Sequence, residues 1–195
     1  MTQKTAKNAD NPREKAVYAA LELSAELGWG NVSLQDISER SGIHLHELSF
    51  YFEDKSDILC SLGRMIDQKT LEHASSADPD ASVRDALFDV FMDRFDVLND
   101  YREGIVGILN SFKLDPKQAV ISLPHLCRSM NWMLEAAHVN TGGIRGAVKV
   151  AGMTALYLRV LKVWLSDESP DLSATMAALD KDLGRAEQFA NSFSL

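Results

Sequence analysis

Histidine and cysteine are the side chains of this sequence best suited to nucleophilic, general-base or metal chemistry, but their spacing does not favour such a role. His125 and Cys127 are two positions apart, and on a helix such a pair points in directions about 200° apart. Cys60 and Cys127 are too few for a disulfide framework or a zinc site, and we expect reduced thiols. The sequence also lacks a glycine-rich phosphate loop and a Gly-x-Ser-x-Gly motif. It therefore predicts a protein that is not an enzyme, with no catalytic residues and no cofactor.

A second close pair, His44 and His46, raises the question of a metal site. If both residues lie in one helix, their side chains diverge and cannot share an ion. We therefore expect no metal ligands. As surface groups the two histidines either donate to phosphate or are simply solvated, and the charge of a histidine changes in the physiological pH range.

Composition and charge define the class of protein. The 195 residues include 28 acidic and 20 basic side chains, which gives a formal net charge of −8. The first residues are polar and lack the apolar core of a secretory signal, and every long apolar stretch contains a charge within about 18 residues. We expect a soluble, cytoplasmic protein without stable membrane insertion. The acidic balance also counts against a protein whose whole surface follows nucleic acid, because phosphate binding needs clustered Lys and Arg.

Helix-start motifs divide the chain. Four prolines follow a residue that commonly caps a helix, in the pairs Asn11-Pro12, Asp78-Pro79, Asp115-Pro116 and Ser169-Pro170. Between them apolar residues recur at spacings of three and four, without the alternation of strands. The sequence therefore predicts an all-α fold of about nine helices, near residues 12–27, 33–41, 45–51, 55–74, 79–98, 101–113, 116–139, 144–167 and 170–191.

Residues 33–52 have the pattern of a helix-turn-helix. Ser33 and Asp36 form a capping box at the start of the first helix, and Gly42 supplies a permissive backbone at the turn. Five apolar residues are spaced so that they can be buried together: Leu34, Ile37, Ile43, Leu48 and Phe52. In such a unit the second helix enters the major groove of DNA. We therefore expect its outer residues to face base edges and phosphates.

The stretch from Ala16 to Leu59 resembles the DNA-binding domain of the TetR family of transcriptional regulators. A Gly-Trp turn, an Ile-Ser-x-x-Ser-Gly-Ile turn and the pattern Tyr51-Phe52-x-x-Lys55-x-x-x-Leu59 carry the resemblance. It implies that Lys55 opens a helix and holds a DNA phosphate. The expected DNA-contacting residues are Ser33, Gln35, His44, Leu45, His46, Glu47, Ser49, Phe50, Tyr51 and Lys55.

The resemblance also implies an organisation and a function. Residues 1–56 form the helix-turn-helix domain with an N-terminal arm, and residues 57–195 form a helical domain for ligand binding and dimerisation. The protein is then expected to be a ligand-responsive repressor that binds a palindromic double-stranded DNA operator as a homodimer. Its ligand would be an apolar small molecule of unknown identity.

The chain departs from the family pattern in the second helix of the motif. His44 and His46 stand where the family usually has a small residue and a glycine, Glu47 where Thr or Ser is common, and Ser49 where a phosphate-binding Tyr is usual. Residues 1–60 contain six basic and ten acidic side chains, a net charge of −4. The shortage of cations thus lies in the block whose pattern predicts DNA binding.

The C-terminal part predicts a dimer face. Residues 144–165 are apolar nearly all round, so this helix is expected to be buried on more than one side. With the apolar stripe of the last helix beside it, we expect a homodimer through the helices near 144–167 and 170–191. The alternative is one large monomeric core.

Large flexible and aromatic side chains in the middle helices predict an apolar ligand pocket, although such a cluster also fits an ordinary core. The expected lining residues are Phe91, Met92, Phe95, Leu109, Phe112, Met130, Met133, Met153, Tyr157 and Trp164. The polar candidates beside them are Asn110, His125, Cys127, Arg128, Asn131 and His138.

A second resemblance offers an alternative function. The stretch from Trp164 to Asp180 is similar to the C-terminal region of the TetR-like lipid-binding accessory proteins of ubiquinone biosynthesis. That family keeps the fold, holds an isoprenoid lipid in its apolar pocket and does not bind DNA. The acidic balance fits this alternative, whereas Tyr51, Phe52 and Lys55 fit the regulator.

Overall fold

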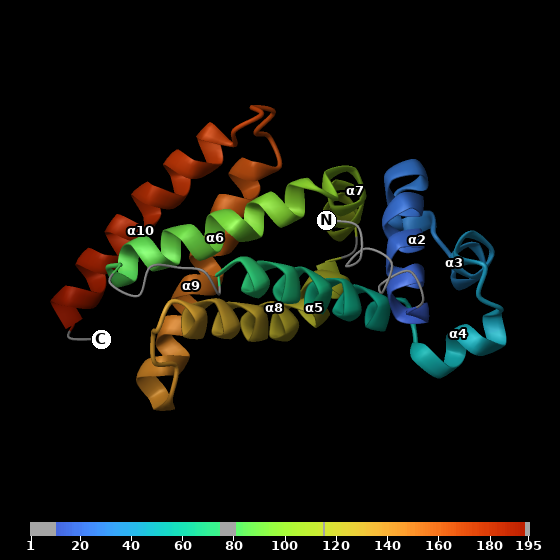
Figure 1. The fold of residues 1–195 in the computed structure, drawn as a ribbon, viewed down its shortest axis with the longest axis horizontal. Helices are drawn as coiled ribbons and strands as arrows, with labels where there is room; N and C mark the ends of the chain where they lie inside the picture. Colours follow the sequence, from blue (N-terminus) through green and yellow to red (C-terminus); the bar gives the residue numbers. More distant parts are fainter. Residues whose placement is uncertain (1–10, 75–80, 115, 194–195) are drawn as a thin grey trace. The chain divides into compact units, whose positions relative to one another are not determined.

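The computed structural model describes residues 11–74, 81–114 and 116–193, and in this part of the chain it contains helices and no strand (Figure 1). This confirms the all-α prediction. The elements are α2 (Pro12–Leu27), the 3₁₀-helix η1 (Trp29–Asn31), α3 (Leu34–Ser41), α4 (Leu45–Tyr51), α5 (Lys55–Ala74), α6 (Val83–Asn99), α7 (Arg102–Leu114), α8 (Pro116–Ala136), α9 (Gly143–Trp164) and α10 (Ser173–Phe193).

Contacts between residues divide the chain into two compact units. The first consists of Met1–Met65 with Leu98–Leu123, and the second of Ile66–Val97 with Pro124–Leu195. Each unit is therefore built from two segments that are distant in sequence. The division into a DNA-binding domain at 1–56 and a ligand domain at 57–195 concerns function and stays a prediction.

Local capping explains why the N-terminal helices begin where predicted. Asn11 accepts a hydrogen bond of 3.1 Å from the backbone N–H of Arg13, and Pro12 occupies the first helical position. Ser33 and Asp36 form the predicted capping box, in which Ser33 Oγ accepts from Asp36 N–H at 3.1 Å and Asp36 Oδ2 accepts from Ser33 N–H at 2.8 Å. Both starts are thus fixed by the residues next to them.

Two predicted helix starts are wrong. α6 begins at Val83 rather than at residue 79, because Ser82 Oγ accepts the N–H of Asp85 at 3.2 Å and caps the helix there. α10 begins at Ser173 rather than at residue 170, after Leu172 at a φ of 50°. Residues 78, 79 and 115, which belong to two of the predicted proline caps, lie outside the described residues.

Two predicted helix ends are also too late. α8 ends at Ala136 rather than at residue 139, and His138 follows it with a φ of 60°, which a right-handed helix does not allow. α9 ends at Trp164 rather than at residue 167, because Asp167 is used to cap the next helix.

In the first unit α2 packs against α3 and α7 (Figure 1). Gly104 and Gly107 of α7 make a close approach possible. A Cβ added at Gly104 would lie 2.6 Å from the carbonyl oxygen of Leu21, and one at Gly107 would be closer still to the carbonyl oxygen of Ser24. The two helices therefore meet backbone to backbone, at a place where no larger side chain fits.

The second unit has a buried core rich in aromatic and methionine side chains. Its fully buried side chains include Phe91, Phe95, Met130, Met133 and Trp164. α9 and α10 lie side by side (Figure 1), and Asp182 of α10 accepts from Arg159 of α9. The apolar stripe predicted for the last helix is buried in part, at Leu172, Leu179 and Leu183.

The connection between α9 and α10 depends on Asp167, which is 5% exposed. Its carboxylate accepts the N–H and the hydroxyl of Thr175, both at 2.7 Å, and the N–H of Ser169 at 3.1 Å. Burial acts to raise the pKa of this carboxyl, but the hydrogen bonds from Ser169 and Thr175 outweigh burial and lower the pKa to about 2. Asp167 is thus a charged N-terminal cap of α10.

We predict that Gly107→Ala destabilises the protein by about 1–3 kcal/mol, because the added methyl collides with the backbone of α2. Gly63→Ala is the matched control. Gly63 is also helical, but a Cβ there meets nothing within 4 Å, and the change should stabilise the protein by up to about 1 kcal/mol. Urea unfolding of both variants measures the difference, and equal effects would contradict the packing argument.

We also predict that ionisation of Asp167 makes the stability of the folded protein depend on pH. Its pKa is about 2 in the folded protein and 3.8 ordinarily, so its stabilising effect is present above pH 4 and is lost as the pH falls towards 2. At pH 7 Asp167→Asn should destabilise the protein by about 1 kcal/mol, because the amide keeps one acceptor oxygen but loses the charge and the second acceptor. The difference from wild type should shrink at pH 2. Thermal unfolding across this range tests the prediction, and Asp171→Asn, at a neighbouring exposed position, is the control.

Candidate nucleic-acid interface

The geometry of the helix-turn-helix is fixed by buried contacts at the turn between α3 and α4. Gly42 has a φ of 71°, a left-handed conformation that glycine adopts without strain. The buried hydroxyl of Ser38 donates to the carbonyl of Ile43 at 2.6 Å. Of the five apolar residues expected to be buried together, Ile37, Ile43, Leu48 and Phe52 are buried, whereas Leu34 is half-buried. The helix-turn-helix is thus built as the sequence pattern predicts.

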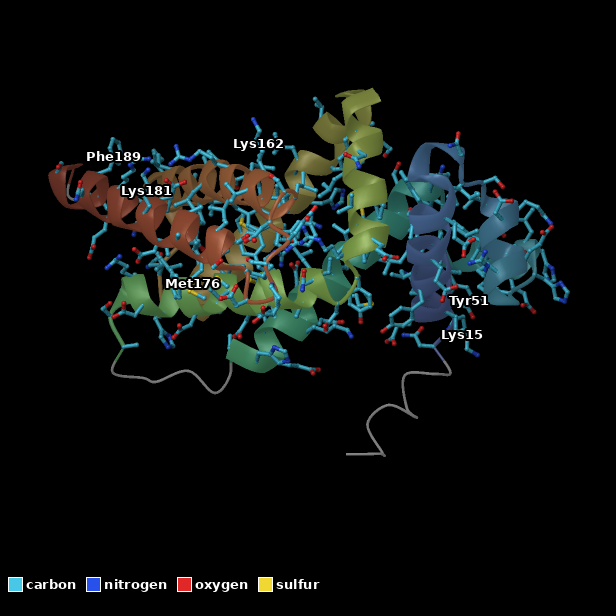
Figure 2. All side chains as sticks on the ribbon, turned by 90° about the horizontal axis from the view of Figure 1, so that it is seen from above. Lys15, Tyr51, Lys162, Met176, Lys181 and Phe189 are labelled. Atoms are coloured by element: carbon cyan, nitrogen blue, oxygen red, sulfur yellow. The ribbon has the colours of Figure 1, made fainter. Side chains whose placement is uncertain are left out.

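α4 presents most of its side chains to solvent. Only Leu48 is buried within this helix. Phe50 follows Leu48 by two positions and therefore points to the opposite side, where it is 81% exposed. The predicted contact residues that are exposed in α4 and at its start are His44, Leu45, His46, Glu47, Ser49 and Phe50. Tyr51, labelled in Figure 2, is half-buried at the end of the helix.

The two predicted contact residues of α3 are exposed, but both are tied to acidic neighbours. The hydroxyl of Ser33 donates to Asp36 at 2.6 Å, as part of the capping box. The side-chain amide of Gln35 donates to Glu39 at 2.8 Å, one turn further along α3. Both side chains therefore have to exchange partners, or share them, in order to donate to DNA.

The histidine pair differs from the sequence-based expectation. His44 is the N-cap of α4 and lies outside the helix. The premise that both histidines lie in one helix is therefore wrong. Their rings are 5.8 Å apart between centroids and inclined by 19°, which is a stacked arrangement. In the described part of the chain no group of three or more His, Cys, Asp or Glu side chains is arranged to hold a metal ion.

Arg40, the cation at the end of α3, is held by carboxylates of α2. Its guanidinium donates to both carboxylate oxygens of Glu26, at 2.9 and 2.7 Å, and to Glu22 at 3.3 Å. The hydrogen bond from Arg40 lowers the pKa of Glu26 and so keeps that carboxylate ionised. The positive charge of Arg40 is therefore balanced within the protein.

Lys55 has a structural role that the sequence pattern does not reveal. Its ammonium group donates to the carbonyl of Trp29 at 2.9 Å and to the carbonyl of Val32, and lies 4.5 Å from the centre of the Trp29 ring. Burial lowers the pKa of Lys55, and the charge of Asp36 opposes this effect. Lys55 thereby ties the start of α5 to the segment that leads into α3. One of its three N–H donors remains for a phosphate.

The residues predicted to line a ligand pocket fall into both compact units. Leu109 and Phe112 belong to α7 of the first unit. The other eight belong to the second unit, where Met92 is half-buried and the rest are buried: Phe91, Met92, Phe95, Met130, Met133, Met153, Tyr157 and Trp164. The structure therefore brings eight of the ten residues into one unit.

At the centre of these eight residues lies a polar cluster that sequence reasoning missed. Arg94 is 3% exposed and donates to Asp67 at 2.5 Å and to the hydroxyl of Tyr157 at 3.3 Å. Ser129 donates to the other oxygen of Asp67 at 2.7 Å. Burial acts to lower the pKa of Arg94, but Tyr157 and Asp67 outweigh burial and raise the pKa, so the arginine stays charged. Arg94 lies at helical spacing from the buried Val90, Phe91 and Leu98, so a charge on the apolar face of α6 is the signal in the sequence that could have found Arg94, though not its partners.

A pocket of about 730 Å³ opens in the first unit. It is lined by η1, by α7 and by the ends of α2 and α5, with Trp29, Lys55 and Asn110 among its residues. None of the ten predicted pocket residues lines it, whereas Asn110 was a polar candidate. Lys55 thus faces a cavity as well as its carbonyl partners.

Comparisons with known proteins bear on this geometry. No family model matches the chain, and no curated protein matches its sequence. Solved structures do match. A TetR transcriptional regulator from Nitrosomonas europaea is 25% identical, with a TM-score of 0.73, over 92% of this chain and 99% of that one. The fold is that of the TetR family. A structure from Syntrophomonas wolfei described as a TetR-family regulator is 17% identical, with a TM-score of 0.61, over 92% of this chain and 94% of that one. Another from Rhodococcus is 17% identical, with a TM-score of 0.57, over 88% and 98%.

The TetR-type fold supports a transcriptional regulator. Among the described residues, no helix is both long and apolar enough to span a bilayer. The comparisons give no support to the ubiquinone accessory proteins. The stretch that resembles those proteins has a structural role here, because Trp164 and Leu179 are buried in the core, while Asp167 caps α10 by accepting from Thr175.

We predict that Lys55→Met destabilises the protein by about 1–2 kcal/mol, because two carbonyl groups lose a charged donor. Lys162→Met, which removes the same charge from an exposed position on α9, is the control and should change stability by less than about 0.5 kcal/mol. Urea unfolding measures both. Equal stabilities of the two variants would show that the carbonyl bonds of Lys55 do not stabilise the fold.

Proposed function

We propose that this protein is a ligand-responsive TetR-type repressor that binds a palindromic operator as a homodimer. The observation that carries this proposal is the exposed helix α4 held on a buried helix-turn-helix core. In such a motif the second helix enters the major groove. The TetR-type fold of the whole chain supports the same function.

The roles of the residues follow from their places in the motif. The exposed side chains of α4 and His44 face base edges in the major groove. Ser33 and Gln35 at the start of α3, with Tyr51 at the end of α4, lie at the rim of that surface and contact the phosphate backbone. Lys55 keeps its two carbonyl partners and offers its remaining N–H to a phosphate.

The exposed side of α9 supports dimerisation. It is a stripe of apolar and small residues, in which Ile144 is 87% exposed and a Cβ at Gly152 would meet nothing within 4 Å. The stripe consists of Ile144, Ala147, Val148, Ala151, Gly152, Ala155 and Leu158. α10 adds exposed apolar side chains beside it, of which Met176 and Phe189 are labelled in Figure 2. Small residues let a second helix approach closely, so we propose that α9 and α10 of two copies form a four-helix bundle.

Release from DNA is proposed to occur by a shift in population. An apolar ligand that binds among the aromatic and methionine side chains of the second unit would favour a conformation whose two α4 helices no longer match the half-sites. The half-sites of such an operator lie about one helical turn of DNA apart. The ligand then reduces the population that can bind DNA.

Selection from a random duplex library, at low and moderate salt, tests the function. The expected result is a palindromic site whose affinity falls as salt rises. Small molecules extracted from the purified protein are identified by mass spectrometry in the same experiment. Failure to enrich any duplex, together with a co-purified isoprenoid, would contradict the proposed repressor function and support the lipid-binding alternative.

We predict that Ala155→Arg raises the dimer dissociation constant by about 100-fold, because a charge would be buried without a partner at the proposed interface. Sedimentation equilibrium measures the change. Asp89→Arg introduces arginine at an exposed position of α6 and should leave dimerisation intact. An Ala155→Arg protein as dimeric as the wild type would exclude this face of α9 from the interface.

A further inference from the structure

Phe50 is the most exposed large apolar side chain of the helix-turn-helix. It is 81% exposed, whereas Leu45 of the same helix is 45% exposed. Leu48 and Phe52 on either side of it are buried, so the fold of the motif does not need the Phe50 ring. Single exposed apolar side chains are common on protein surfaces, but this ring lies on the helix that a helix-turn-helix places in the major groove. The position therefore points to an intermolecular contact.

The place of Phe50 on α4 identifies the contact surface. His46 and Phe50 are four positions apart and so lie on the same side of the helix, opposite the buried Leu48. His46 stacks on His44. The hydroxyl of Ser49 donates back to the carbonyl of His46 at 2.7 Å. The outermost part of α4 is thus an apolar ring beside polar groups that already have partners.

The electrostatics of the motif increase the importance of this ring. Arg40 is bound by Glu22 and Glu26, and Lys55 by two backbone carbonyls. The carboxylates balance the charge of Arg40, and two carbonyls occupy donors of Lys55, so these two cations contribute less to phosphate binding. A larger share of the affinity has to come from contacts with base edges.

In the major groove the base edges carry one apolar group, the 5-methyl group of thymine. We propose that Phe50 reads a thymine methyl in each half-site of the operator and is the main determinant of sequence specificity in α4. This inference rests on the proposed function. It adds the chemical feature of DNA that the protein recognises.

Replacing thymine by deoxyuridine removes this methyl group and leaves all base-pair hydrogen bonds in place. In the operator obtained by selection, the replacement is made at one thymine position at a time, in both half-sites. We expect one thymine position at which the replacement weakens binding of the wild-type protein. The affinity should fall about fourfold when one half-site is changed, the effect of losing one buried methyl group, and more than tenfold when both half-sites are changed. Binding is measured by fluorescence anisotropy at fixed salt.

Phe50→Ala should bind the thymine operator more weakly than the wild type and should be insensitive to the replacement. Its thermal unfolding should be unchanged, since the ring is exposed. Val120→Ala, at another exposed apolar position, is the control and should retain both affinity and sensitivity to deoxyuridine.

Three results would overturn the inference while leaving the proposed function intact. They are a selected operator without a fixed thymine in each half-site, a wild-type affinity that no deoxyuridine changes, and a Phe50→Ala protein as sensitive as the wild type. If no duplex is enriched at all, the proposed function fails and the reading of thymine fails with it.

Discussion

The close approach of α2 and α7 is the constraint on which the first unit depends. Gly104 and Gly107 let the two backbones meet, and α7 thereby completes a core that the helix-turn-helix could not close alone. α2 in turn packs on α3, and the turn at Gly42 then places α4. The position of the exposed helix is thus determined by residues more than fifty positions away in the sequence. A segment from the middle of the chain belongs to the unit that bears the candidate DNA-binding surface.

Two positively charged side chains hold the helices of the first unit together. Arg40 joins α3 to α2 through Glu22 and Glu26, and Lys55 joins α5 to the segment around η1 through two carbonyls. Lys55 was expected to hold a DNA phosphate, but the structure gives both Lys55 and Arg40 partners within the chain. A count of basic residues therefore overestimates the cations available to DNA. Residues 1–60 carry a net charge of −4, and Arg40 and Lys55 are two of their six basic side chains.

Features that depend on neighbouring residues could be predicted from the sequence, and features that depend on distant partners could not. The caps at Asn11 and Ser33 and the turn at Gly42 are local, and each lies where predicted. The start of α10 was misplaced because Ser169 does not cap the helix at Pro170: it accepts from the N–H of Ser173, and Asp167 accepts from the N–H of Thr175. The partners of Lys55 lie 26 and 23 residues away, and those of Arg94 lie 27 and 63 away. No local pattern reports such pairs, so the cluster around Arg94 appeared only in the structure.

That cluster has a consequence for how the second unit can vary. Asp67, Arg94, Ser129 and Tyr157 come from α5, α6, α8 and α9, and the bonds from Arg94 to Asp67 and Tyr157 and from Ser129 to Asp67 link the four helices. The phenylalanine and methionine side chains around the cluster can exchange for others of similar volume at small cost. Arg94 and Asp67 cannot be replaced singly, since the loss of either leaves a buried charge without its partner. Among relatives that keep this core, these two positions are therefore expected to change together, and a chain with apolar residues at all four would be a separate solution to the same packing problem.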